Sequence, residues 1–422
     1  MESQQPYAIF KPSWCQRSFS RITPGSLRGS IFTLCASAIG AGLLSLPYAV
    51  NQCGLILGIL MLIIGGLCFG VYYLILVAVC DDQQIYDFVA VTVKLYGEAG
   101  RRLTEVSVTI LCFGTVAAYM VLVSSFLTSV LESFGVIGVG DIDTARVVII
   151  LALTVCVWLP LSLPKEITSL SYFSLLSVVG ILYITILVLF QSPVYISENP
   201  EFSQQIEFFK LNKNILNAVG ITFFAYDAVQ NVPIIYSELQ RPSKVRMTKV
   251  VFRTIALLAF LYIILGVSGY LSYLDQMPDL VVFRTPLGGG SSAYDWPMVV
   301  ARVMVCLYLT VAVVLNFYPL RLSMEQFIAG SDLTPSPFRY YSLTVILLGL
   351  AAAVAIVVPD AVFYFKVLGG IFAAELSFVL PAMLYWKISN NTTKKLVVSG
   401  VAAVLMALGL ACAVDSIIQL VQ

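Results

Sequence analysis

The chain has 422 residues, of which 59% are hydrophobic and only 11% charged, and its formal net charge is +1. A soluble domain has about 25% charged residues, so a water-soluble protein of this composition would have too few polar side chains to cover its surface. The composition predicts an all-α, polytopic membrane protein surrounded by hydrocarbon. The sequence contains no basic block, which argues against nucleic-acid binding. It contains no histidine, which excludes His-based metal sites and His-based catalysis, and no cofactor is expected.

Apolar runs that approach the roughly 20 residues needed to cross a bilayer follow one another along the chain. Eleven such runs cover residues 30–52, 55–79, 106–131, 146–163, 170–190, 214–236, 252–274, 297–320, 340–358, 361–386 and 396–418. The fourth is short, and only Pro359 and Asp360 separate the ninth from the tenth. We expect one transmembrane domain over residues 30–422, preceded by a cytoplasmic N-terminal segment, residues 1–29.

The distribution of Lys and Arg predicts the orientation, because these residues are retained on the cytoplasmic side. With the N-terminus inside, 18 of the 24 basic residues fall in inner segments. The six others are Arg146, Lys210, Lys213, Arg284, Arg302 and Lys366. With eleven spans, the C-terminus is then outside or lumenal. A plasma membrane and a vacuolar or other endomembrane location both fit this multi-pass topology.

Two minor features have simple interpretations. Glu98, Arg101 and Arg102 are placed in a short inner loop, either as a gating contact or as solvated charges. The abundance of Tyr and Phe, 22 and 25 residues, is attributed mainly to interface belts and to packing against lipid.

Helix-breaking residues interrupt the first span. Gly40, Gly42 and Pro47 lie within eight residues of one another. Each glycine weakens a helix by about 1 kcal/mol relative to alanine, and proline removes a backbone donor. One interpretation is a broken helix whose freed backbone groups bind a carboxylate and a cation. The other is a face of small residues for close helix packing.

The sixth span carries a matching interruption. The polar residues Tyr226, Asp227, Gln230 and Asn231 lie near mid-membrane and are followed by Pro233. A carboxylate at this depth costs about 2.5–3.5 kcal/mol on insertion scales. The first and sixth spans are corresponding members of two five-helix halves. Paired interrupted helices at corresponding positions indicate the binding site of a transporter.

At this point the chain resembles the amino acid/auxin permease family, which includes vacuolar amino acid transporters and sodium-coupled neutral amino acid transporters. The most family-like stretches are residues 40–49 with Gly54, residues 223–226 and 233–239, residues 316–321, and residues 368–370 and 378–382. The resemblance implies a LeuT-like fold, in which helices 1–5 and 6–10 form an inverted repeat with broken helices 1 and 6, and an eleventh helix is appended. It also implies a non-enzyme that carries out secondary active transport of amino acids by alternating access, as a monomer.

The resemblance also implies positions for the substrate at the two breaks. The backbone groups offered to its carboxylate would be those of Gly40, Ala41 and Gly42. Its amino group and side chain would be lined by Phe224, Ala225, Tyr226 and Asp227. Asp227 is unusual for the family at this place, and it either pairs with the substrate ammonium or caps the half-helix that follows.

The coupling ion is open between H⁺ and Na⁺. Sodium-coupled members of the family often carry an amide on helix 1, where this chain has Thr33 and Ala36. Thr33 and Thr310 are the candidate cation ligands. Glu375, in apolar surroundings on the tenth span, is either a proton carrier or a buried partner for a basic residue, with Arg302 the first candidate.

The alternative to a transporter is a nutrient sensor that binds an amino acid and signals through a partner. Such sensors usually add a long cytoplasmic tail, and residues 1–29 offer only a short one, which favours the transporter.

Overall fold

The computed structural model describes residues 25–136, 142–164, 174–198, 206–274, 277–284, 295–329 and 337–421. Ten helices in these ranges are long and apolar enough to cross a membrane, and a bent pair at the start of the chain makes an eleventh span. The predicted all-helical fold with eleven spans is therefore confirmed.

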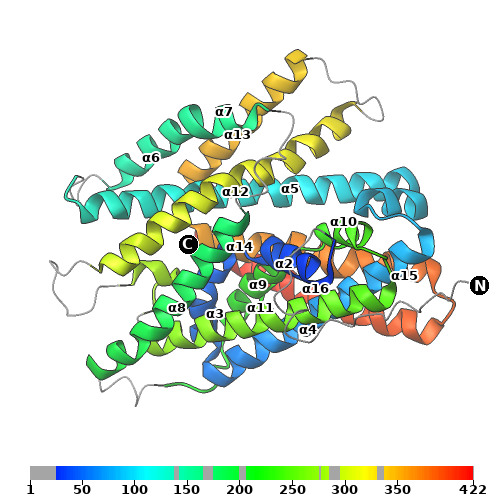
Figure 1. Ribbon diagram of the computed structural model, residues 1–422, viewed down its shortest axis with the longest axis horizontal. Helices are drawn as coiled ribbons and strands as arrows, with labels where there is room; N and C mark the ends of the chain where they lie inside the picture. The colour runs from blue at the N-terminus through cyan, green and yellow to red at the C-terminus, as the bar shows by residue number, and fades with distance from the viewer. Residues whose placement is uncertain are drawn as a thin grey trace, which may run out of the picture.

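The described helices divide into two sets of five spans and one further helix, and Figure 1 shows how they lie in space. The first set is α2 (Leu27–Ala38) with η1 (Ala41–Ser45) and α3 (Leu46–Cys53), α4 (Leu55–Gln83), α5 (Phe88–Ser133), α6 (Ile142–Leu153) with η3 (Thr154–Trp158) and α7 (Leu159–Ser162), and α8 (Ser174–Glu198). The second set is α9 (Ile215–Tyr226) with α10 (Asn231–Glu238), α11 (Lys244–Tyr273), α12 (Trp296–Ala329), α13 (Pro337–Val357), and α14 (Ala361–Leu368) with η8 (Gly369–Ala373), η9 (Glu375–Val379) and α15 (Leu380–Ile388). The short helix η7 (Val281–Phe283) lies between α11 and α12, and α16 (Thr392–Val421) ends the chain.

Corresponding helices of the two sets pack against each other. The second spans, α4 and α11, are in extensive contact, and so are the third and eighth, α5 and α12. The fourth and ninth, α6 and α13, lie together at the upper edge of Figure 1. The first and sixth meet through α3 and α9. This pairing is what an inverted repeat requires, and it brings the two interrupted helices into contact.

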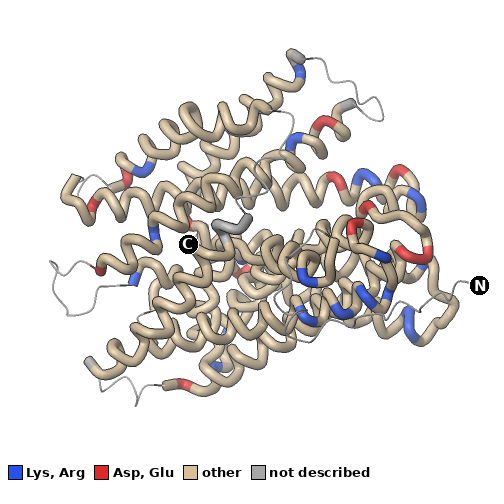
Figure 2. Tube along the Cα trace, in the orientation of Figure 1, with Lys and Arg blue, Asp and Glu red and all other residues tan. Residues whose placement is uncertain are grey.

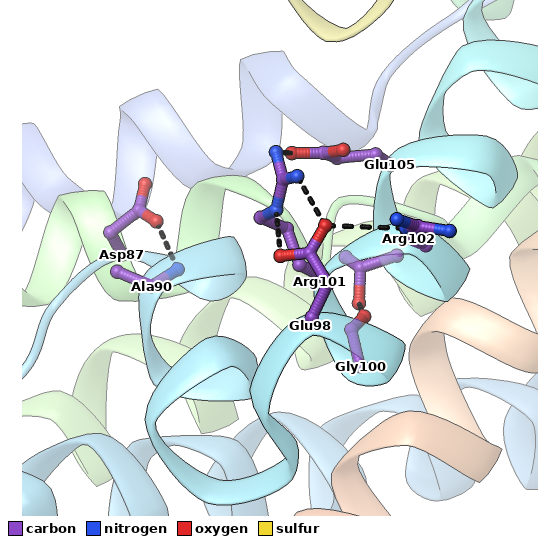
Figure 3. A network of polar contacts seen from close by, with 8 residues as sticks. Asp87, Ala90, Glu98, Gly100, Arg101, Arg102 and Glu105 are labelled. Atoms are coloured by element: carbon purple, nitrogen blue, oxygen red, sulfur yellow. Dashed lines mark hydrogen bonds and ion pairs between the residues drawn. The ribbon is translucent and has the colours of Figure 1, made fainter. Parts of the chain in front are cut away.

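Helix α5 begins earlier than predicted, so the placement of Glu98, Arg101 and Arg102 in a loop is wrong. The Asp87 carboxylate accepts a hydrogen bond from the Ala90 N–H at 2.6 Å and caps the new N-terminus. The helix is broken once, at Gly97, with φ 65° and ψ −150°, a conformation for which glycine is preferred. Beyond it, Glu98, Arg101, Arg102 and the buried Glu105 form the ion-pair network of Figure 3.

The boundary between the ninth and tenth spans lies where it was predicted. Helix α13 ends at Val357 and α14 begins at Ala361. The Asp360 carboxylate accepts a hydrogen bond from the Val362 N–H at 2.8 Å and starts the new helix. Residues 358–360 therefore form the turn between the ninth and tenth spans.

Charged residues gather at one end of the bundle. Figure 2 shows most of the Lys and Arg at the end marked N, and few at the opposite end. This asymmetry matches the loop pattern in the sequence and is the arrangement that retains one end on the cytoplasmic side.

Candidate functional site

The interruptions predicted in helices 1 and 6 are both present. In helix 1 the segments Leu27–Ala38 and Ala41–Cys53 are bent by 60° at the break. In helix 6, residues 227–230 leave the helix between α9 and α10. Backbone groups freed in this way need partners, because unsatisfied polar groups in a bilayer cost several kcal/mol each.

The two breaks touch at Gly42. A Cβ atom placed on Gly42 would lie 2.8 Å from Cδ1 of Phe224 and 3.4 Å from Cα of Ala225. A side chain at this position would therefore have to displace the ring of Phe224. The glycine allows the backbone of helix 1 to approach the break of helix 6 directly.

A buried tyrosine of α4 holds the break of helix 6. The Tyr73 hydroxyl donates to the Tyr226 carbonyl at 2.7 Å and accepts from the Ala228 N–H at 2.7 Å. One side chain thus satisfies the carbonyl before the break and the amide within it. This replaces hydrogen bonds that a continuous helix would have supplied.

Two further tyrosines hold the breaks from other helices. The Tyr262 hydroxyl of α11 donates to the Ala225 carbonyl at 2.7 Å, with the Ala38 carbonyl of helix 1 at 3.5 Å. The Tyr119 hydroxyl of α5 lies 2.9 Å from the position of a Cβ on Gly40. Both breaks are therefore held by hydroxyls from neighbouring helices.

Sequence reasoning missed these three tyrosines, because it attributed the tyrosine content mainly to interface belts. Tyr73 and Tyr262 are fully or almost fully buried, and Tyr119 is 6% exposed. Their position deep inside apolar runs was the available signal. An interfacial tyrosine is expected near the end of a span.

Asp227 lies within the break of helix 6 and is only partly buried. Its carboxylate accepts a hydrogen bond from the Ser377 hydroxyl of η9 at 2.8 Å. The Val229 N–H also interacts with it. No ion pair to Asp227 occurs within the described ranges, so a cationic group of a ligand would have no competitor there.

The other predicted substrate residues differ in accessibility. Ala41, Gly42, Ala225 and Tyr226 are buried, whereas Gly40 and Phe224 are partly accessible. The Tyr226 hydroxyl already donates to the Leu62 carbonyl at 3.1 Å, and its neighbour Phe224 stacks on Phe365 with ring centroids 4.7 Å apart. The partly accessible residues among those predicted at the junction are thus Gly40, Phe224 and Asp227.

The two threonines predicted as cation ligands lie on different helices, Thr33 on α2 and Thr310 on α12. The Thr33 hydroxyl donates to the Gly29 carbonyl at 2.9 Å and the Thr310 hydroxyl to the Cys306 carbonyl at 2.7 Å, so both are engaged within their own helices. Helix α12, which carries Thr310, packs mainly on α5 and α8. No group of three or more Cys, Asp or Glu that could hold a metal ion occurs in the described part of the chain.

Glu375 does not pair with Arg302, and that expectation was wrong. Glu375 accepts a hydrogen bond from the Ser107 hydroxyl of α5 at 2.9 Å. Arg302 instead donates through Nε to the Val282 carbonyl at 3.0 Å. Glu375 is partly buried, and among the described residues it has no basic partner within ion-pair distance.

An eleven-span inverted repeat with interrupted first and sixth helices defines a LeuT-like membrane protein. Two solved structures share this fold. A Na⁺-coupled sialic acid symporter in its substrate-bound outward-open state matches with a TM-score of 0.51 and 11% identity, over 94% of this chain and 90% of that one. MhsT in complex with L-phenylalanine matches with a TM-score of 0.56 and 11% identity, over 93% and 100%.

The family model described as "transmembrane amino acid transporter protein" matches residues 23–422. The chain belongs to this family, which is one of transporters and not of enzymes.

Similar proteins occur in distant organisms. A putative amino acid transporter AAT1 of Plasmodium berghei is 26% identical over 74% of this chain, and the match spans only 50% of that longer protein. Sodium-coupled neutral amino acid symporter 2 of Danio rerio is 26% identical over 87% of this chain and 76% of its own. Amino acid transporter AVT6A of Arabidopsis thaliana is 28% identical over 86% and 81%.

Proposed function

We propose that this protein carries amino acids across a membrane by alternating access, with the substrate held between the breaks of helices 1 and 6. The observation that carries the proposal is the contact of Gly42 with Phe224 and Ala225, close in the chain to the carboxylate of Asp227, which forms no ion pair among the described residues. Backbone groups of helix 1 would take the substrate carboxylate, and Asp227 would take its ammonium group. The names of the relatives support an amino acid as the substrate.

The tyrosine hydroxyls suit this function because they supply rigidity without occupying the junction. Tyr73 and Tyr262 keep the freed backbone of helix 6 in one geometry. A preformed site loses less entropy when it binds its ligand. Alternating access would then move the paired helices around a fixed set of contacts.

We propose that the coupling ion is a proton carried by Glu375. Among the described residues Glu375 forms no ion pair, and its carboxylate accepts a hydrogen bond from the Ser107 hydroxyl. Glu375 and Ser377, which contacts Asp227, belong to the same π-helical turn, η9. A change in the charge of Glu375 would therefore act on the segment that supports Asp227.

We further propose that the protein works as a monomer with its N-terminus in the cytoplasm. The end of the bundle with few Lys and Arg would then face the outside or the lumen (Figure 2).

The experiment is uptake into proteoliposomes that contain the purified protein. Labelled neutral, cationic and acidic amino acids are each tested with an imposed proton gradient, with an imposed sodium gradient and with neither. The proposal expects saturable uptake of at least one class, driven by the proton gradient. Saturable binding without uptake would instead favour an amino acid sensor, and uptake driven only by sodium would contradict the role of Glu375.

A further inference from the structure

A coil segment between α8 and α9 crosses the start of α4 (Figure 1). We call its residues 206–211 the strap. The Leu55 N–H donates to the Glu207 carbonyl at 2.9 Å, and the Ile56 N–H donates to the Phe208 carbonyl at 3.0 Å. The first N–H groups of a helix have no partner within the helix, so carbonyl groups of the strap cap α4.

The strap is also bonded to the end of helix 1. The Lys210 N–H donates to the Cys53 carbonyl of α3 at 2.7 Å, and the Lys210 ammonium group donates to Oδ1 of Asn51 at 3.1 Å. Gly54, between α3 and α4, has φ 83°, and a Cβ atom there would lie 2.9 Å from three backbone atoms of the strap. Glycine therefore both permits this turn and lets the backbone of the strap pack directly on it.

The polarity of the strap is the reverse of that of a loop in water. Phe208, Phe209 and Leu211 are 53%, 56% and 84% exposed. The side chain of Lys210 is only 13% exposed and is turned toward helix 1. A loop in water exposes lysine and buries large apolar side chains, so a contiguous group of exposed apolar side chains marks a surface that contacts something apolar.

These side chains continue the apolar outer face of α4. The exposed residues of that face, each 38% to 56% exposed, are Ile56, Leu60, Ile63, Ile64 and Leu67. The 29 residues of α4 span about 43 Å at roughly 1.5 Å per residue, which matches the roughly 40–45 Å of a bilayer with its headgroups. Because the other end of α4 carries Asp81 and Asp82, its first turn lies at the level of the opposite headgroups, and the strap lies beside it.

We infer that the strap binds the lipid surface, with Phe208, Phe209 and Leu211 at the boundary between headgroups and acyl chains, and that this contact holds the end of helix 1. Because the one lysine of the strap is turned inward, a zwitterionic lipid surface is sufficient as the partner. The contact does not depend on which solute the protein carries. It links the bilayer to α3, the part of helix 1 that follows the break.

The first test uses tryptophan fluorescence of the full chain in phosphatidylcholine vesicles. Phe208→Trp and Phe209→Trp each add one fluorophore to the four tryptophans of the chain, and quenching is measured as the difference from the unsubstituted protein. The quenchers are lipids brominated either near the headgroup or near the bilayer centre. Phe260→Trp is the matched control, because Phe260 is 62% exposed in the middle of α11.

The strap tryptophans should be quenched more by bromine near the headgroup, and the control more by bromine near the bilayer centre. Quenching of the strap tryptophans by aqueous acrylamide but not by brominated lipid would place the strap in water. Quenching by neither would mean that another protein or a second copy covers it. Either result would overturn the inference.

The second test measures the hold on helix 1 by hydrogen exchange of the amides of residues 54–57 in the same vesicles. Phe208→Ser combined with Phe209→Ser should speed this exchange by about fivefold or more, because returning even half of one such side chain to water is worth a factor of that order. Phe338→Ser, which removes a side chain that is 83% exposed at the start of α13, should leave it unchanged. Equal exchange in both variants would show that lipid contact does not hold helix 1.

A third variant tests the packing of the strap on Gly54. Gly54→Ala adds a Cβ against the strap and should abolish the headgroup-level quenching of Phe208→Trp. Gly135→Ala is the control, because Gly135 has φ 69° and a Cβ there meets no heavy atom of the described residues within 4 Å. It carries the same backbone strain without the contact, so quenching should persist. Persistence of quenching in Gly54→Ala would show that the strap is not held by this turn.

Discussion

The hydroxyl of Tyr73 in α4 lies 2.7 Å from the backbone nitrogen of Ala228 and accepts its hydrogen bond. The same hydroxyl donates to the carbonyl of Tyr226, on the other side of the start of the break. The conformation of helix 6 at the proposed substrate site is therefore set by a side chain of another helix. The shape of the site should depend on this one oxygen atom.

Tyr73→Phe removes the oxygen and leaves the ring. One buried donor and one buried acceptor lose their partner, which costs about 1–3 kcal/mol each. We expect a lower unfolding temperature together with weaker amino acid binding. Thermal unfolding and equilibrium binding are measured on the same preparation.

Tyr72→Phe is the matched control, because the adjacent Tyr72 hydroxyl donates to the Val398 carbonyl of α16 at 2.6 Å. It should lower stability without changing amino acid affinity. If both variants changed affinity alike, the hydroxyl of Tyr73 would have no special role at the break.

Gly42→Ala tests the contact between the two breaks. The added Cβ would lie 2.8 Å from Cδ1 of Phe224, so the Phe224 ring must move at the junction of the two breaks. We expect uptake to fall to near background while the protein still folds. Gly400→Ala is the control, because a Cβ there meets no heavy atom within 4 Å. Alanine in the interior of α16 should be neutral or stabilise by up to about 1 kcal/mol.

Asp227→Asn removes the charge at the helix 6 break and keeps the size of the side chain. A hydrogen bond to a charged group contributes about 1.5–3 kcal/mol, so affinity for amino acids should fall by about tenfold or more. Ser377→Ala removes only the hydroxyl that donates to Asp227 and should have a smaller effect. Competition by amino acids and by their N-acetylated forms provides the measurement. If Asp227→Asn weakened both forms equally, Asp227 would act as a cap and not as a ligand for the ammonium group.

Glu375→Gln tests proton coupling. The amide can still accept a hydrogen bond from Ser107, so the contact between η9 and α5 is kept, but it cannot release a proton. We expect uptake driven by a pH gradient to be lost while exchange of internal for external amino acid persists. Uptake that kept its dependence on the proton gradient in Glu375→Gln would remove Glu375 from the coupling mechanism.

Sequence and structure agree best where local composition decides the outcome. The sequence predicted the eleven spans, the turn at Asp360 and both helix breaks. These features depend on the length of an apolar run and on proline and glycine, which affect the backbone only within a few residues. The start of α5 was missed, because the segment that Asp87 caps, before the break at Gly97, precedes the apolar run that marks the span.

By itself, the sequence determined that this protein spans a membrane, how many times it does so, and at which residues its first and sixth helices are interrupted. Only the tertiary structure decided what holds those interruptions and what faces them. The hydroxyls of Tyr73 and Tyr262 reach backbone groups more than 30 residues away in the chain, and Ser377 reaches Asp227 across 150. Composition and periodicity indicate whether a helix is surrounded by lipid, water or protein. Hydrogen bonds between residues that are distant in the chain depend on how the helices pack.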